Sequence, residues 1–134
     1  MTNPELWEQL AEELATEMLF MANGDTVILS DGDRFVQFKQ GSDRLDAEAV
    51  SNRWLPSDQR LSADDEERLE ALGWRHPEPS LGLDNWRHSE EWPLRTAAAR
   101  SLAQRLVSTL RDVMKVDDPR VLEARRFNVF TAHP

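Results

Sequence analysis

The sequence contains no cysteine, and this absence removes several classes of protein. There is no disulfide framework, no thiol nucleophile and no thiolate metal site. Long apolar runs are also missing, because the longest one near the N-terminus, Met18–Ala22, falls far short of the roughly 18 residues that span a bilayer. The first residues are acidic where a secretory signal is basic. We therefore expect a cytoplasmic protein with no membrane association.

Basic residues are scarce relative to acidic ones. The 134 residues include 25 Asp and Glu against 16 Lys and Arg, which gives a formal net charge of −9. An acidic domain repels phosphate backbones, and nucleic-acid binders normally carry a basic patch. The single basic cluster, Arg120, Arg125 and Arg126, lies beside Glu123 near the end of the chain. We expect no nucleic-acid partner.

Tyrosine is absent, yet five tryptophans and a hydrophobic content of 40% argue against disorder. The length fits one domain with a core of its own. No linker or repeat divides the chain, so we predict a single domain over residues 1–122 and a tail over 123–134. The apolar residues of this tail, Phe127, Val129 and Phe130, could dock on the chain's own sheet or on a neighbour's, or remain disordered.

Helical periodicity is clearest at the two ends of the predicted domain. A first helix is expected to begin after Asn3, with Pro4 in its first turn. A second, shorter helix is expected to begin at Ser62 and to end at Gly73. A long helix is predicted over 94–114, with its apolar column at Leu94, Ala98, Leu102, Leu106 and Leu110.

A period of two residues replaces the helical period after the first helix. Strands are predicted over 26–30, 34–40 and 45–50, joined by short turns at Asp31-Gly32 and Gly41–Asp43. Two further short strands are predicted over 74–76 and 85–88. The element order is then α-β-β-β-α-β-β-α, which indicates an α+β fold with an antiparallel sheet.

Motifs that carry catalysis are missing. There is no G-x-S-x-G, no P-loop, no G-x-G-x-x-G and no H-E-x-x-H. The three histidines (His76, His88 and His133) are far apart in sequence, and each is interpreted as a surface or hydrogen-bonded residue. Asp31-Gly32-Asp33 does not continue as a calcium loop, because arginine and apolar residues follow. We predict no enzymatic activity, no metal and no cofactor.

The tryptophans divide into two groups. Trp7 and Trp74 lie at the edges of clear apolar patterns, so we expect both in the core. Trp54, Trp86 and Trp92 lie in loop-rich sequence, where a tryptophan is either exposed and anchors a protein interface or buried as a large core residue.

Several short patterns in order resemble the type III secretion chaperone fold, and more closely its bacterial YbjN-like relatives, the TY-Chap domains. The patterns are Phe35-Val36-Gln37-Phe38, Leu45-x-Ala47-Glu48-x-Val50-Ser51-Asn52, Leu69-x-x-Leu72-Gly73-Trp74, Thr109-Leu110-Arg111-Asp112-Val113 and Asp118-Pro119. Together they span roughly residues 24–122. The resemblance implies a heart-shaped or flat α+β domain, usually a homodimer, that holds extended client polypeptides without ATP or catalysis.

An antiparallel sheet with an apolar face can accept an extended chain by edge pairing or by pockets for alternate side chains. We predict that Phe35, Val36, Phe38, Glu48, Trp54 and Trp86 contact the client. The acidic surface favours basic client segments. Two alternatives are a structural or regulatory protein that only self-associates, and a small-molecule-binding protein or hydrolase.

Overall fold

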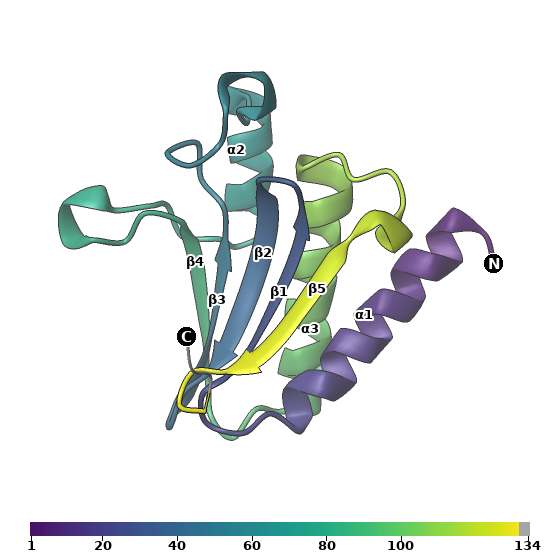
Figure 1. Cartoon of the computed structure of the whole chain (residues 1–134), viewed down its shortest axis with the longest axis vertical. Coiled ribbons are helices and arrows are strands. Elements are labelled where there is room, and N and C mark those ends of the chain that lie inside the picture. The colour runs from purple at the N-terminus through teal and green to yellow at the C-terminus, as the bar shows by residue number, and fades with distance from the viewer. Residues whose placement is uncertain (132–134) are drawn as a thin grey trace.

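Five antiparallel strands form one sheet in the order β4-β3-β2-β1-β5 (Figure 1). The computed structural model of the chain describes residues 1–131. The strands are β1 (Asp25–Asp31), β2 (Arg34–Gln40), β3 (Arg44–Ala49), β4 (Trp86–Glu91) and β5 (Glu123–Asn128). The predicted α+β fold with an antiparallel sheet is confirmed.

Three α-helices accompany the sheet: α1 (Asn3–Leu19), α2 (Ala63–Ala71) and α3 (Thr96–Ser108). A π-helical segment, Thr109–Val113, continues α3, and short 3-10 helices occupy Ser57–Gln59, Pro79–Leu81 and Pro119–Val121. Helix α1 is capped by the Thr2 side chain, one residue before the predicted cap. Helix α2 begins as predicted, because Ser62 and Asp65 form a capping box.

Helices α1 and α3 cover one face of the sheet (Figure 1). The strand alternation turns Val36 and Phe38 toward these helices, where both are fully buried. Leu106 and Leu110, from the predicted apolar column, are also fully buried. Trp7 and Trp74 are 1% and 2% exposed, so their predicted place in the core is confirmed.

The opposite face of the sheet, here called the open face, carries no helix within residues 1–131. It is the side toward the viewer in Figure 1. The register places Ile28, Gln37, Glu48 and Arg87 in one row across this face, and Phe35 beside Ser30 in the next. Ile28 and Phe35 are only partly buried, so the open face retains accessible apolar surface.

Two predictions about connectivity are corrected. Residues 74–76 are not a strand; Arg75 makes only an isolated bridge to Arg87. Residues 123–128, predicted as the start of a tail, form β5 and pair with β1 along its whole length. The order after α2 is therefore β4-α3-β5, and the sheet extends to Asn128. Residues 132–134 of the predicted tail, including His133, lie outside the described residues.

Candidate functional site

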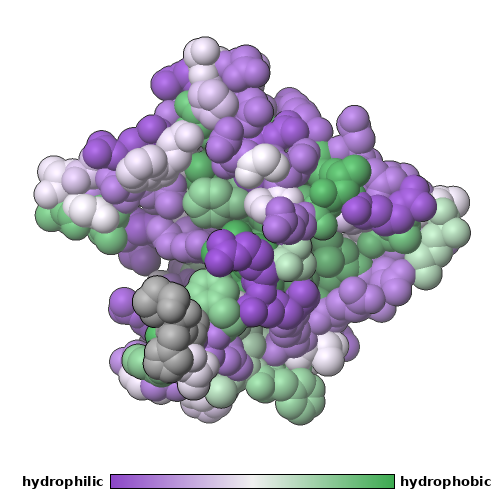
Figure 2. Space-filling model, viewed as in Figure 1, coloured by the Kyte–Doolittle hydropathy of each residue, from purple (hydrophilic) through white to green (hydrophobic). Residues whose placement is uncertain are grey.

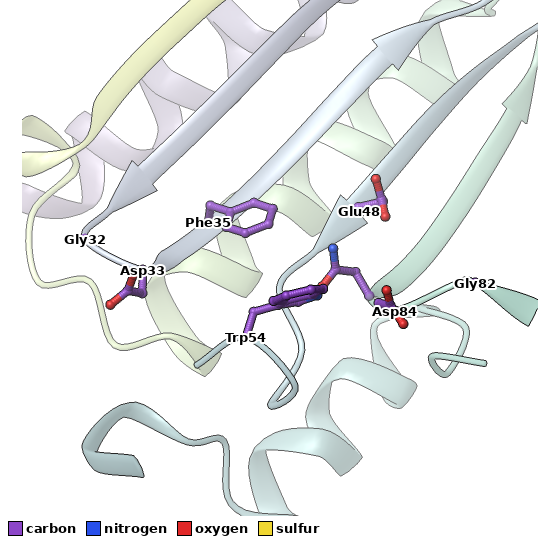
Figure 3. A pocket seen from close by; sticks show the side chains of 8 residues that line it. Gly32, Asp33, Phe35, Glu48, Trp54, Gly82 and Asp84 are labelled. Carbon is purple, nitrogen blue, oxygen red and sulfur yellow. The ribbon is translucent and has the colours of Figure 1, made fainter. Parts of the chain in front are cut away.

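The open face contains a recess of about 590 Å³, here called the Trp54 recess (Figure 3). It is lined by Gly32, Asp33, Phe35, Glu48, Trp54, Gly82, Asp84 and Asn85. Figure 3 shows that these residues come from the β1–β2 turn, two neighbouring strands and two loops. The recess therefore has an aromatic part, formed by Phe35 and Trp54, and carboxylates on several sides.

Hydrogen bonds between two loops set the position of Trp54. The Ser51 backbone N–H donates to Asn85 Oδ1 at 3.1 Å, and the Ser51 hydroxyl donates to the Asp84 carbonyl oxygen at 2.6 Å. Trp54 N–H donates to the Ser51 carbonyl oxygen at 3.1 Å, which closes a turn. The loop carrying Trp54 is thus tied to the loop carrying Asp84, on a rigid scaffold of the kind that presents binding residues.

The three carboxylates of the recess have different partners. Glu48 Oε2 accepts a hydrogen bond from Gln37 Nε2 at 2.6 Å. Asp84 Oδ1 lies 3.5 Å from Arg53 Nε, and the Arg53 guanidinium lies 5.3 Å from the centroid of the Trp54 ring. Asp33 is exposed on the β1–β2 turn. The recess is therefore acidic, with one arginine at its margin.

A second depression of about 660 Å³, here called the central groove, lies beside the Trp54 recess on the open face. Its lining includes Ile28, Gln37, Lys39, Arg44, Asp46, Glu48, Arg87, Phe127 and Val129. Glu48 belongs to both depressions. Figure 2, viewed from the same side, shows hydrophilic and hydrophobic atoms interleaved over this face. The two depressions together form a mixed surface along the strands.

The structure brings together half of the predicted contact residues. Phe35, Glu48 and Trp54 all line the Trp54 recess, and Trp54 is 53% exposed. Sequence reasoning missed Asp84, which lies in an irregular loop that the Ser51 hydroxyl ties to the loop carrying Trp54. Sequence reasoning also placed Phe127 in a tail. Phe127 lies on the open face only because β5 pairs with β1, and that pairing joins segments that are distant in sequence.

Val36, Phe38 and Trp86 cannot contact a client, and their predicted role is wrong. All three are completely buried. Val36 and Phe38 alternate with Phe35 and Gln37, so they face the helices and not the open face. Trp86 starts β4 and packs against the His76 ring, with 4.5 Å between the ring centroids.

A cluster of ionisable residues lies between β4 and α3. His88 Nε2 is 2.7 Å from Glu90 Oε1. Burial lowers the pKa of His88, against the opposing effect of its hydrogen bond to Glu90. Burial also lowers the pKa of Arg105. Within residues 1–131, no group of three His, Asp or Glu side chains is arranged to hold a metal ion.

The α+β fold with its five-stranded antiparallel sheet is a type III secretion chaperone-like fold. The chain matches the family model described as "T3SS (YopN, CesT) and YbjN peptide-binding chaperone 3", TY-Chap3, over residues 3–128. It belongs to this family. No curated protein and no solved structure matches the chain. No helix within residues 1–131 is long and apolar enough to cross a membrane.

Proposed function

We propose that the chain binds an extended segment of a client polypeptide across the open face of its sheet, without catalysis. The observation that carries this proposal is the helix-free face itself, which leaves Ile28, Phe35 and Phe127 only partly buried. Apolar surface left uncovered next to recesses marks an interaction site. The description of the family as peptide-binding chaperones supports the same role.

Recognition on the open face depends on side chains. The inner strands β3, β2 and β1 each pair on both sides, so their backbone groups are satisfied within the sheet. Alternate side chains of an extended segment are about 6.6 Å apart, and those on one face point the same way. We propose that one of them enters the Trp54 recess while a neighbour on the same face lies over the central groove.

Replacing Phe35 by threonine is expected to weaken client binding by about 30-fold, which is the size of effect typical of an interface hot spot. Threonine keeps the preference for a strand while it removes the aromatic ring from the recess. Binding would be measured by fluorescence anisotropy, with a labelled peptide selected by the wild-type protein from a library of capped dodecapeptides.

Phe20→Thr is the matched control, because Phe20 is 82% exposed at the end of α1 and does not line either depression of the open face. Its affinity for the selected peptide is expected to equal that of the wild type. Circular dichroism would verify that both variants are folded. Equal loss of affinity in the two variants, or none in Phe35→Thr, would contradict binding at this face.

We further propose that the chain forms a homodimer through the outer edge of β5. The Val129 N–H donates to the Gly24 carbonyl oxygen at 2.9 Å. In an antiparallel ladder these bonds alternate, so the backbone groups of Ala124 and Arg126 point away from β1. Both residues are exposed. An unpaired strand edge of this kind is a template for pairing with another chain.

The side chains of β5 suit pairing with a second copy. A two-fold axis at Ala124 sets Glu123 opposite Arg125 of the second copy. Both residues lie on the open face, because they pair with Ser30 and Ile28 of β1. Opposite charges placed directly across a strand pair are stabilising, and like charges are destabilising. The dimer joins two open faces into one continuous surface.

Arg125→Glu is expected to convert the dimer into a monomer. The two-fold axis makes the 123–125 contact occur twice, and the substitution places two glutamates opposite each other at both contacts. The double variant Glu123→Arg/Arg125→Glu restores the opposite charges and is expected to restore the dimer. Light scattering during size-exclusion chromatography would measure the mass of each. A wild-type protein that stays monomeric at high concentration contradicts this interface.

We propose that the protein acts in the cytoplasm and has no nucleic-acid partner, which the net charge of −9 and the absence of cysteine support. The alternative of self-association without a client predicts a dimer in light scattering and no peptide selected from the library. The same two measurements therefore separate the two functions.

A further inference from the structure

We propose that the Trp54 recess binds an arginine side chain of the client segment. This inference rests on the proposed function, because it names the residue type that one subsite of the open face recognises. The recess combines an exposed indole, the Phe35 ring and three carboxylates among its lining residues. That combination fits a flat cation better than it fits an apolar or acidic side chain.

The residues that line the recess include three carboxylates and no lysine or arginine. Within residues 1–131, Asp33 and Glu48 form no ion pair. In the same part of the chain, Arg53 is the only ion-pair partner of Asp84. Carboxylates in a concave site focus a negative potential into it, and this potential attracts cationic side chains. A cation that enters also loses less solvation than it would in a purely apolar recess.

The chain's own Arg53 illustrates the interaction that we propose. Its guanidinium lies over the Trp54 ring, 5.3 Å from the centroid, while Nε lies 3.5 Å from Asp84 Oδ1. Arg53 is not among the residues that line the recess, although Trp54 and Asp84 are. The Trp54 indole therefore contacts the Arg53 guanidinium, which lies outside the recess, and also forms part of the recess wall.

Arginine is favoured over lysine by the shape of the site. A guanidinium is planar, is weakly hydrated and carries five donors, so it can stack on an aromatic ring while it bonds a carboxylate. Glu48 Oε2 already accepts from Gln37, which fixes the orientation of this carboxylate. A fixed carboxylate beside aromatic rings therefore binds the planar guanidinium of arginine more strongly than the compact ammonium of lysine.

The probe is Nα-acetyl-arginine methylamide, whose only charge is the guanidinium, and the comparison ligand is the citrulline analogue, which has the same shape and no charge. Titrations would follow the Trp54 indole N–H and the Gly82 amide by two-dimensional NMR. We expect the arginine ligand to bind about tenfold more tightly than citrulline. Its affinity should fall as salt is added, because added salt screens exposed charges.

Glu48→Gln keeps the size of the side chain and its hydrogen bond to Gln37, and we expect it to weaken arginine binding several-fold. Glu91→Gln is the matched control, since Glu91 is exposed at the end of β4 and lines neither depression. The corresponding lysine derivative would be titrated in the same way. The assignment would be overturned if arginine bound no more tightly than citrulline or than lysine, or if the Trp54 signal did not shift. Peptide binding that depends on Phe35 but not on arginine would leave the proposed function standing.

Discussion

Replacing Leu106 or Leu110 by alanine is expected to lower the free energy of unfolding by about 2–5 kcal/mol. Both side chains are completely buried, Leu106 in α3 and Leu110 in the π-helical segment that follows. Truncation removes apolar contacts and leaves a cavity that close-packed neighbours fill only in part. The loss is a large share of the roughly 5–15 kcal/mol that stabilises a domain.

Urea unfolding, followed by circular dichroism at one protein concentration, would measure these effects. A fixed concentration matters because self-association adds to apparent stability. Gln104→Ala, at an exposed position of α3, is the control and is expected to change stability by less than about 0.5 kcal/mol. If the Leu106→Ala and Leu110→Ala variants had the same urea midpoint as the control, α3 and the π-helical segment would not form the core.

Trp74→Ala is expected to cost about 3–5 kcal/mol, because it empties the space between the end of α2 and the π-helical segment. Trp74 Nε1 donates to Thr109 Oγ1 at 2.9 Å, and this hydroxyl donates to the Arg105 carbonyl oxygen at 2.7 Å. The Arg105 guanidinium lies 5.9 Å from the Trp74 ring. Trp74 therefore packs in the apolar core while its N–H is hydrogen-bonded to the Thr109 hydroxyl.

Trp54→Ala provides the comparison for Trp74→Ala, since it removes the same side chain from an exposed position. We expect it to leave the urea midpoint nearly unchanged. Trp74→Phe keeps an aromatic ring but removes the pyrrole part of the indole together with its N–H donor. The lost hydrogen bond to Thr109 should therefore add about 1 kcal/mol to the cost of the smaller side chain. If Trp74→Ala were as mild as Trp54→Ala, the network at Thr109 would contribute little to stability.

Local sequence patterns predicted those parts of the structure that depend on near neighbours. The period of two residues predicted β2, and the i+4 spacing from Leu102 to Leu110 predicted a buried helix. Trp7 and Trp74, at the edges of clear apolar patterns, were correctly placed in the core. The capping box at Ser62 marked the start of α2 because its two hydrogen bonds connect residues three apart.

The features that sequence reasoning missed depend on contacts between distant segments. Strand β5 reads as a polar tail because Glu123, Ala124, Arg125 and Arg126 are all exposed, so no alternation marks it. Trp86 lies next to loop residues in sequence, and its burial in the core depends on the pairing of β4 with β3. Neither contact leaves a periodic signal, so neither can be read from one sequence.

The position of β5 at the edge of the sheet has a consequence for the chain while it is being synthesised. β1 pairs with β2 across a two-residue turn, but its other edge pairs with β5, so that Thr26 lies opposite Phe127. Until residues 123–128 leave the ribosome, four strands can assemble while β1 keeps one edge unpaired. Unpaired edges promote aggregation, and pairing between distant segments is slow to form. A nascent chain of this protein therefore passes through a stage in which one edge of β1 is free to pair with another chain. That stage ends when β5 pairs with β1.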